Sequence, residues 1–239
     1  MKVAPPSHAT VVSHGTQPAE VLAAEVNGVC WRLSRPADLE TLWNGMGEGA
    51  LGEDERLPYW VELWPAAVLL ARWLGQNAPR LAGRTCLDVG CGLGLSALVA
   101  AAAGARVLAF DYEAEALAYA RRNIALNQAS LAGPSYLAPP LFTLMDWRKP
   151  ALAAGSAEVI VGADILYERR FFEPVAALLD HALAPGGVVW LADPERAVSS
   201  GVWERLEGLG WHVETPLADK VSQGGQYMTV FLRQLSRRS

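Results

Sequence analysis

The sequence holds few of the residues that mark several common classes of protein. Three cysteines among 239 residues are too few for a disulfide framework, and four scattered histidines lack the spacing of a metal site. No window of about 18 residues is uninterruptedly apolar, so no membrane-spanning helix is predicted. Residues 1–17 lack the basic and apolar regions of a secretion signal and suggest a loose arm. We therefore expect a protein of the reducing cytoplasm with no metal and no membrane partner.

Basic charge is scarce as well. The chain has 20 Lys and Arg against 25 Asp and Glu, and its net charge of −5 argues against a nucleic-acid partner. An apolar share of 51% in 239 residues is enough for one α/β domain with a full core. We expect this domain to be a monomer.

One stretch, residues 85–96, carries the strongest signal in the chain. A short apolar run predicts a buried strand over 85–89, and Gly90, Gly92 and Gly94 then turn the chain into a helix over about 93–103. Strand, glycine turn and helix form the frame in which a nucleotide-like ligand meets backbone at the carboxyl end of a parallel sheet. Glycine is favoured there because a Cβ atom would block the close approach of backbone and ligand.

The residues around the glycines separate two kinds of ligand. A dinucleotide site expects a third glycine at position 95, where this chain has Leu95, and the carboxylate of Asp88 would repel a pyrophosphate. S-adenosylmethionine has no phosphate, and its ammonium and sulfonium suit an acidic rim. The next predicted strand, 105–110, ends in Asp111, about 20 residues on, where an acid can bind both ribose hydroxyls. The alternative is a purely structural role, in which the glycines form a tight strand–helix turn and Asp111 is a solvated aspartate.

The remaining chain alternates predicted strands and helices. Further strands are predicted over 141–144, 159–162, 188–192, 211–214 and 227–232, with a loop between the last two, and further helices over 65–76, 113–128, 171–183 and 199–209. The dipeptide Asn27–Gly28 predicts a small N-terminal hairpin, and a short helix is possible over 37–43. This order indicates an α/β fold with a doubly wound parallel sheet and an antiparallel edge. We divide the chain into an arm and hairpin extension, 1–56, and a main domain, 57–239.

The glycine turn, the acidic end of the second strand and the seven-strand pattern resemble the class I S-adenosylmethionine-dependent methyltransferases. The resemblance covers about residues 57–232. It implies a Rossmann-like sheet with strand order 3-2-1-4-5-7-6, in which strand 7 is antiparallel. It also implies S-adenosylmethionine as the cofactor.

Three further marks resemble a narrower group, the family-16 lysine methyltransferases. They are Trp64–Pro65 before the first core helix, Asp146–Trp147 after the third strand, and the Asp-x-x-Tyr pattern of Asp164 and Tyr167 after the fourth. The resemblance implies that Asp164 binds and orients the acceptor amine, while Tyr167 walls the channel and offers its ring to the cation. A helix N-cap and a packed core ring are the structural alternatives for these two residues.

One branch of that group, which methylates the electron-transfer flavoprotein β subunit, is resembled most. The Pro-Tyr-Trp segment 58–60 and the Asp193–Pro194 pair carry this likeness, although Ala66–Ala67 stands where that branch usually has two glycines. A bacterial branch labelled nicotinamide N-methylase-like shares many of these marks. Glu62 and Asp193 are expected on the substrate side, and an Asp-Pro turn is the alternative for Asp193.

The cofactor site implied by the resemblance extends beyond the glycines. Asp146 would accept a hydrogen bond from the adenine amino group, Trp147 would pack on the adenine ring, and Trp64 would close the pocket. A turn aspartate and two core tryptophans are the alternatives. The complete expected set is Trp64, Asp88, Gly90, Gly92, Gly94, Asp111, Tyr112, Asp146, Trp147 and Ala163.

Three functions remain open from these residues. The first is methyl transfer to a protein lysine, whose amine must be neutral to react although its ordinary pKa is about 10.4. The second is methyl transfer to a small amine or pyridine, and the third is a cofactor-binding interaction module without activity. The intact donor motif and the Asp164 and Tyr167 pair disfavour the third. An open acidic mouth would favour a protein substrate, and a closed pocket a small one.

Overall fold

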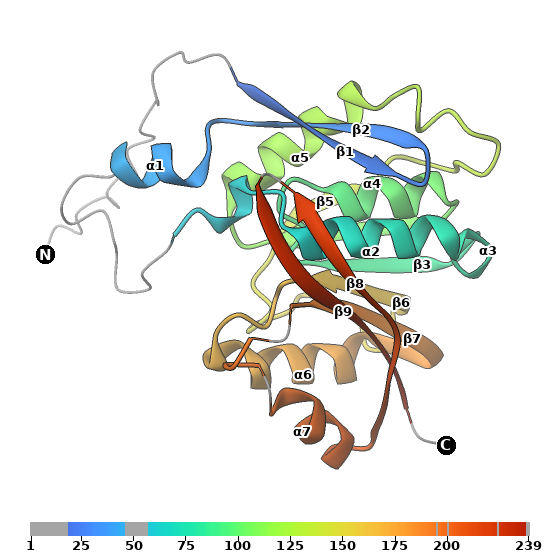
Figure 1. Cartoon of the computed structure of the whole chain (residues 1–239). Helices are drawn as coiled ribbons and strands as arrows, with labels where there is room; N and C mark the ends of the chain where they lie inside the picture. The colour runs from blue at the N-terminus through green and yellow to red at the C-terminus, as the bar shows by residue number, and fades with distance from the viewer. Residues whose placement is uncertain (1–18, 46–56, 195, 200, 224, 238–239) are drawn as a thin grey trace, which may run out of the picture.

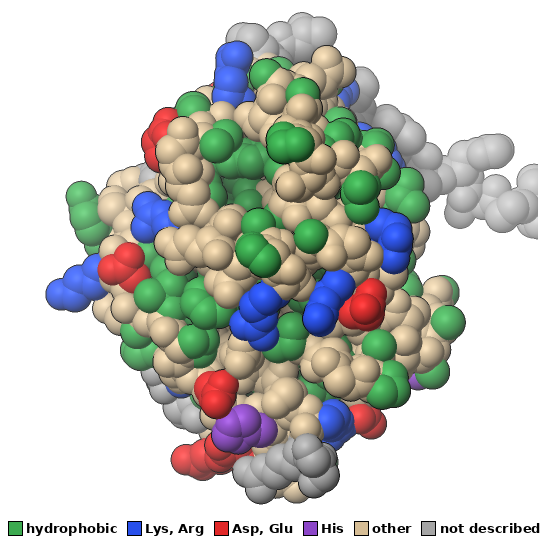
Figure 2. Space-filling model, turned by 90° about the vertical axis from the view of Figure 1, so that its right-hand side faces the viewer, with side chains coloured by type: hydrophobic (Ala, Val, Ile, Leu, Met, Phe, Trp, Pro, Cys, Tyr) green, Lys and Arg blue, Asp and Glu red, His purple; other side chains and the backbone are tan. Residues whose placement is uncertain are grey.

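The computed structural model describes residues 19–45, 57–194, 196–199, 201–223 and 225–237 (Figure 1). The predicted arm, 1–17, lies outside these residues. Within the described ranges, no helix combines the length and the apolarity that crossing a bilayer requires. Figure 2 views the molecule from the side of α3 (Ala78–Leu81), where Lys and Arg are interspersed with Asp and Glu on the visible face.

A seven-stranded sheet forms the centre of the molecule, and its topology confirms the predicted order. The strands are β3 (Thr85–Val89), β4 (Arg106–Asp111), β5 (Leu141–Leu144), β6 (Ala157–Ala163), β7 (Leu183–Asp193), β8 (Trp211–Gln223) and β9 (Gln226–Arg237). They lie in the order β5-β4-β3-β6-β7-β9-β8. Strands β3 to β7 pair in parallel, and β9 is antiparallel to both of its neighbours. The carboxyl ends of β3, β4 and β6 therefore meet at one edge.

Helices cover both faces of this sheet (Figure 1). The helices of the described residues are α1 (Leu39–Gly45), α2 (Pro65–Gln76), α3, α4 (Leu95–Ala102), α5 (Ala114–Leu126), α6 (Phe172–Ala182) and α7 (Val202–Gly208), with single 3-10 turns η1 (Tyr59–Val61) and η2 (Arg169–Phe171). Of these, α1 buries no residue and lies away from the sheet. One core cluster packs α2, α4 and α5 on one face, and a second packs α6 and α7 on the other. Pro65 occupies the first position of α2, where its missing N–H costs no helical hydrogen bond.

The predicted N-terminal hairpin is confirmed as a separate two-stranded sheet of β1 (Glu20–Val26) and β2 (Val29–Arg35). Asn27 and Gly28 turn it with φ values of 51° and 79°, as a two-residue hairpin loop requires. Two buried side chains, Asn123 of α5 and Asn127 directly after it, bind the backbone of β2: Asn123 accepts from the Ser34 N–H at 2.7 Å and Asn127 from the Arg32 N–H at 2.9 Å. Asn123 also donates to the Leu93 carbonyl at 3.0 Å and so links the hairpin to the glycine turn.

The last two strands are longer than predicted. β8 continues to Gln223 and β9 starts at Gln226, so a tight turn at Gly225 replaces most of the expected loop. The outer half of β8 is mostly exposed and polar, and its register shifts between Glu214 and Leu217. Backbone pairing thus extends the hairpin through residues whose sequence lacks the apolar alternation that predicts a strand. β7 likewise begins at Leu183, five residues before the predicted strand.

Candidate active site

The glycine turn connects β3 to α4 and requires glycine for two reasons. Gly90, Gly92 and Gly94 have φ values of 66°, 50° and 89°, in the left-handed region that side chains disfavour. A Cβ atom on Gly94 would also meet Ala120 and Phe142 at 3.2 Å, and one on Gly90 would meet side chains at 3.1 Å. The turn therefore presents bare backbone along the wall of a cavity.

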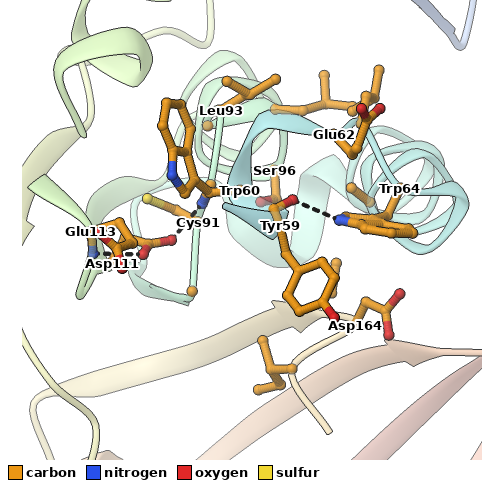
Figure 3. A pocket seen from close by; sticks show the side chains of 18 of the residues that line it. Tyr59, Trp60, Glu62, Trp64, Cys91, Leu93, Ser96, Asp111, Glu113 and Asp164 are labelled. Carbon is orange, nitrogen blue, oxygen red and sulfur yellow. Dashed lines mark hydrogen bonds between the residues drawn. The ribbon is translucent and has the colours of Figure 1, made fainter. Parts of the chain in front are cut away.

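This cavity, with about 800 Å³ of space that includes open solvent, lies at the carboxyl ends of β3, β4 and β6 (Figure 3). It brings together most of the predicted site residues. These are Glu62, Trp64, Gly90, Gly92, Gly94, Asp111, Tyr112, Trp147, Ala163, Asp164 and Tyr167. Asp88, Asp146 and Asp193 are not among its lining residues.

Asp111 fixes the glycine turn to the end of β4. Its Oδ2 accepts from the Gly92 N–H at 2.9 Å, and its Oδ1 accepts from the Glu113 N–H at 3.0 Å (Figure 3). The side chain is buried, and this burial raises the pKa of the Asp111 carboxyl. The carboxylate therefore both shapes the turn and stands at the cavity wall.

Asp88 takes a different place from the one expected at the cofactor rim. It is 1% exposed below the turn, and it accepts a hydrogen bond of 2.6 Å from the Ser96 hydroxyl. Burial raises the pKa of its carboxyl to about 7. Residue spacing could not reveal this, because both faces of β3 are covered and Asp88 points to the α4 side. It holds the first turn of α4 under the glycines.

The raised pKa of Asp88 predicts a pH-dependent stability. The unfolded chain releases this proton near its ordinary pKa of about 4 and the folded protein only near about 7, so the unfolding free energy should fall as pH rises between them. The loss should be at most about 4 kcal/mol. Asp88→Asn should flatten the profile. Denaturant titrations of both proteins at several pH values test this, and equal slopes would assign the effect elsewhere.

Asp164 directly follows β6 and faces the cavity with a strained backbone. Its φ is 55°, its N–H donates to the Ala192 carbonyl at 2.8 Å, and its side chain is 5% exposed. The next helical element in this described stretch is η2, which begins at Arg169. Asp164 is therefore too far from it to be a helix N-cap. Both of its oxygens bind the guanidinium of Arg196, with Nη2 and Oδ2 at 2.8 Å. Sequence reasoning missed this partner, which lies 32 residues away.

Aromatic rings form the wall beside Asp164. Tyr167 packs edge-on against Tyr59 at 5.5 Å and Phe171 at 5.1 Å between ring centroids, and its burial raises the pKa of its hydroxyl. Trp64 donates from Nε1 to the Tyr59 carbonyl at 3.0 Å (Figure 3). Tyr59 therefore connects the two predicted aromatic residues. The position of Tyr59 in the aromatic segment 58–60 was the sequence feature that could have indicated it as a site residue.

Glu62 joins the cavity wall to the N-terminal elements. Its Oε2 lies 2.8 Å from Nη1 of Arg35 at the end of β2, and its Oε1 accepts from the Leu39 N–H at 2.8 Å. Arg35 in turn pairs with Glu20 at 3.0 Å. The hairpin and α1 are thus tied to the segment before α2.

Besides Asp88, two further predicted acids lie outside the cavity lining. Asp193, 2% exposed at the end of β7, accepts from the Ser199 hydroxyl at 3.0 Å, which fits the turn interpretation rather than a channel wall. Asp146 pairs with Arg148 at 2.8 Å near the surface, and its neighbour Trp147 lines the cavity instead. The Arg148 pairing lowers the pKa of Asp146 against the opposing effect of desolvation.

Comparison with known proteins gives related results at the levels of sequence and structure. A family model described as lysine methyltransferase matches residues 51–203. The chain is 30% identical over 132 residues to the mouse (Mus musculus) protein N-lysine methyltransferase METTL21A, covering 54% of this chain and 58% of that protein. It is 44% identical over 71 residues to the electron transfer flavoprotein beta subunit lysine methyltransferase of Danio rerio, covering 29% and 28%. The chain thus spans less than two thirds of either relative.

The fold is also shared with solved structures. One is the magnesium protoporphyrin IX methyltransferase ChlM from Synechocystis PCC 6803 with bound S-adenosylmethionine, with a TM-score of 0.53 and 18% identity. The match covers 72% of this chain and 78% of that one. At this identity the likeness shows the fold alone.

Proposed function

The chain belongs to the lysine methyltransferase family, and we propose that it transfers a methyl group from S-adenosylmethionine to a lysine side chain of a protein substrate. One observation carries the proposal. A single cavity joins the glycine turn and Asp111 on one side to Asp164, Tyr59 and Tyr167 on the other. A donor site and a carboxylate suited to an amine therefore share one space.

The donor side of the cavity fits S-adenosylmethionine. The glycine turn offers close backbone approach, Asp111 offers acceptors for ribose hydroxyls, and Trp147 offers an apolar ring. Tyr112 and Ala163 complete this wall, with Trp64 across from it. When bound, the cofactor supplies an electrophilic methyl group on a sulfonium.

The acceptor side supplies positioning and exclusion of water. Asp164 binds the lysine ammonium by a charge-assisted hydrogen bond, and the rings of Tyr59 and Tyr167 enclose the alkyl chain. The ammonium must lose its proton to water before the nitrogen lone pair can react, because its ordinary pKa is about 10.4. Holding the nitrogen in line with the donor then provides much of the rate enhancement.

A small amine or pyridine is the alternative acceptor, and an inactive binding module is the non-enzymatic alternative. Both share the same donor site. The opening of the cavity to solvent and relatives named for protein and calmodulin lysine methylation support a protein acceptor. The Asp164 carboxylate in the cavity wall suits a cation, which a neutral pyridine does not provide.

Labelling with a cell lysate tests the proposal. The purified chain is incubated with methyl-labelled S-adenosylmethionine and lysate, and labelled proteins are hydrolysed to identify the modified amino acid. We expect label in methylated lysine of one or a few proteins. Label in small amines or pyridines with none in protein would favour the alternative. Cofactor binding without any transfer would favour the inactive module.

We also propose domain bounds, a cellular compartment and an oligomeric state for the protein. We place the transferase domain at residues 57–239, with 1–56 as an extension. The three free cysteines, Cys30, Cys86 and Cys91, support a reducing compartment, which we take to be the cytoplasm. We propose a monomer that uses neither nucleic acid nor membrane.

A further inference from the structure

The turn after β7 positions Arg196 against Asp164, which is one of the residues that line the cavity. The Ser199 hydroxyl contacts Asp193 Oδ1 at 3.0 Å and the Arg196 carbonyl at 3.1 Å, and the Ser199 N–H donates to that carbonyl at 2.8 Å. Asp193 and Ser199 are both buried. The turn is thus anchored from below by these two residues, without help from the Arg196 side chain.

That side chain reaches the carboxylate at the end of β6. The side chain of Arg196 is 30% exposed and that of Asp164, which lines the cavity, is 5% exposed, so the pair links the cavity wall to the protein surface. Its two parallel contacts engage both oxygens of Asp164. The charge of Asp164 and its bond raise the pKa of Arg196, with smaller contributions from Asp193 and Tyr59. The guanidinium therefore occupies the place where a cation is best stabilised.

We propose that Arg196 is an internal surrogate for the acceptor, which a substrate lysine must displace from Asp164. The inference rests on the proposed function and deepens it. The two-point contact with the guanidinium occupies the best hydrogen-bonding positions on both carboxylate oxygens. A substrate ammonium needs one of these positions to bind. Binding thus exchanges one cation for another.

This exchange selects the class of acceptor. A tethered side chain competes at an effective concentration in the millimolar range, so a free amine at lower concentration fails to displace it. A lysine on a protein that docks elsewhere on the surface gains the extra binding energy. Arg196 therefore discriminates protein lysines from small free amines at a site whose chemistry suits both.

Substitution of Arg196 tests this role through binding rather than turnover. The probe is N-acetyl-lysine methylamide, titrated by calorimetry into the complex with S-adenosylhomocysteine. R196Q should bind the probe at least about tenfold more tightly than the wild type, because the fraction of open Asp164 rises. R205Q is the matched control, since Arg205 pairs with Glu173 at the surface between α6 and α7.

A second variant, R196K, keeps the test decisive if R196Q does not fold. R196K keeps the charge but loses the two-point contact, so its affinity for the probe should lie between those of the wild type and R196Q. If R196Q does not fold, R196K alone should still bind the probe several-fold more tightly than the wild type. Affinity for S-adenosylhomocysteine should stay unchanged in every folded variant.

The outcomes separate this inference from the proposed function. Unchanged or weaker probe binding by the folded Arg196 variants would overturn the inference, even if the wild type methylates a protein lysine. Tighter probe binding by R196Q supports it, even if no lysine is methylated and the proposed function fails. If wild type and R196Q both methylate the free probe and do so with equal KM, Arg196 has only a structural role.

Discussion

Asp164→Asn is expected to lower kcat at least about 100-fold while leaving the affinity for S-adenosylmethionine nearly unchanged. Asparagine keeps the shape of the side chain but removes the charge that holds the acceptor ammonium. The hydrogen bonds that join Asp111 to Gly92 and Glu113 in the donor wall do not involve Asp164. Calorimetry gives the donor affinity, and transfer of labelled methyl to the protein acceptor gives kcat.

Asp180→Asn provides a matched control for that experiment. Asp180 on α6 also pairs with an arginine, Arg237, but lies outside the cavity lining. Its substitution should leave both measurements at wild-type values. In Asp164→Asn, the freed Arg196 can turn toward water because it is already 30% exposed, so loss of folding should not obscure the result. Lost donor binding with retained kcat would move Asp164 to the cofactor site.

The sequence predicts the central fold well because its strands are buried on both faces. The runs of β3 and β6 are mostly apolar, each interrupted by one acid, and parallel strands alternate with helices that begin at residues such as Pro65. The Asn27–Gly28 turn is equally local, since its positive φ values demand these residue types. The outer part of β8 is different, because its pairing is made by backbone atoms of a mostly exposed edge strand.

The site residues also differ in whether local sequence or distant contacts determine their place. Asp111, Asp164 and the glycines could be placed together because the carboxyl ends of neighbouring parallel strands meet at one edge. Whether a strand-end acid faces the cavity depends on packing, which is why Asp88 and Asp193 lie elsewhere. The pairing of Arg196 with Asp164 joins two loops, and nothing in the local pattern of either loop indicates it.

Asp111→Ala is expected to weaken binding of S-adenosylmethionine by roughly 1–3 kcal/mol, or about 5- to 150-fold in Kd. The change removes the acceptor proposed for the ribose hydroxyls. It also leaves the N–H groups of Gly92 and Glu113 without the oxygens that they bind at 2.9 and 3.0 Å. Because these two bonds hold the glycine turn to β4, the donor wall should loosen as well. Calorimetry with S-adenosylmethionine measures the effect.

A conservative variant of the same residue separates the contributions of its two oxygens to donor binding. Asp111→Asn keeps one acceptor oxygen, so it can satisfy one of the two N–H groups and should lose less affinity than the alanine variant. Asp219→Asn, which alters a surface acid 3.9 Å from Arg72, should bind like the wild type. At saturating donor, both Asp111 variants should recover much of their turnover, whereas Asp164→Asn should not. Wild-type affinity in Asp111→Ala would mean that neither bond to the turn matters for the donor, and the cofactor position would have to move away from β4.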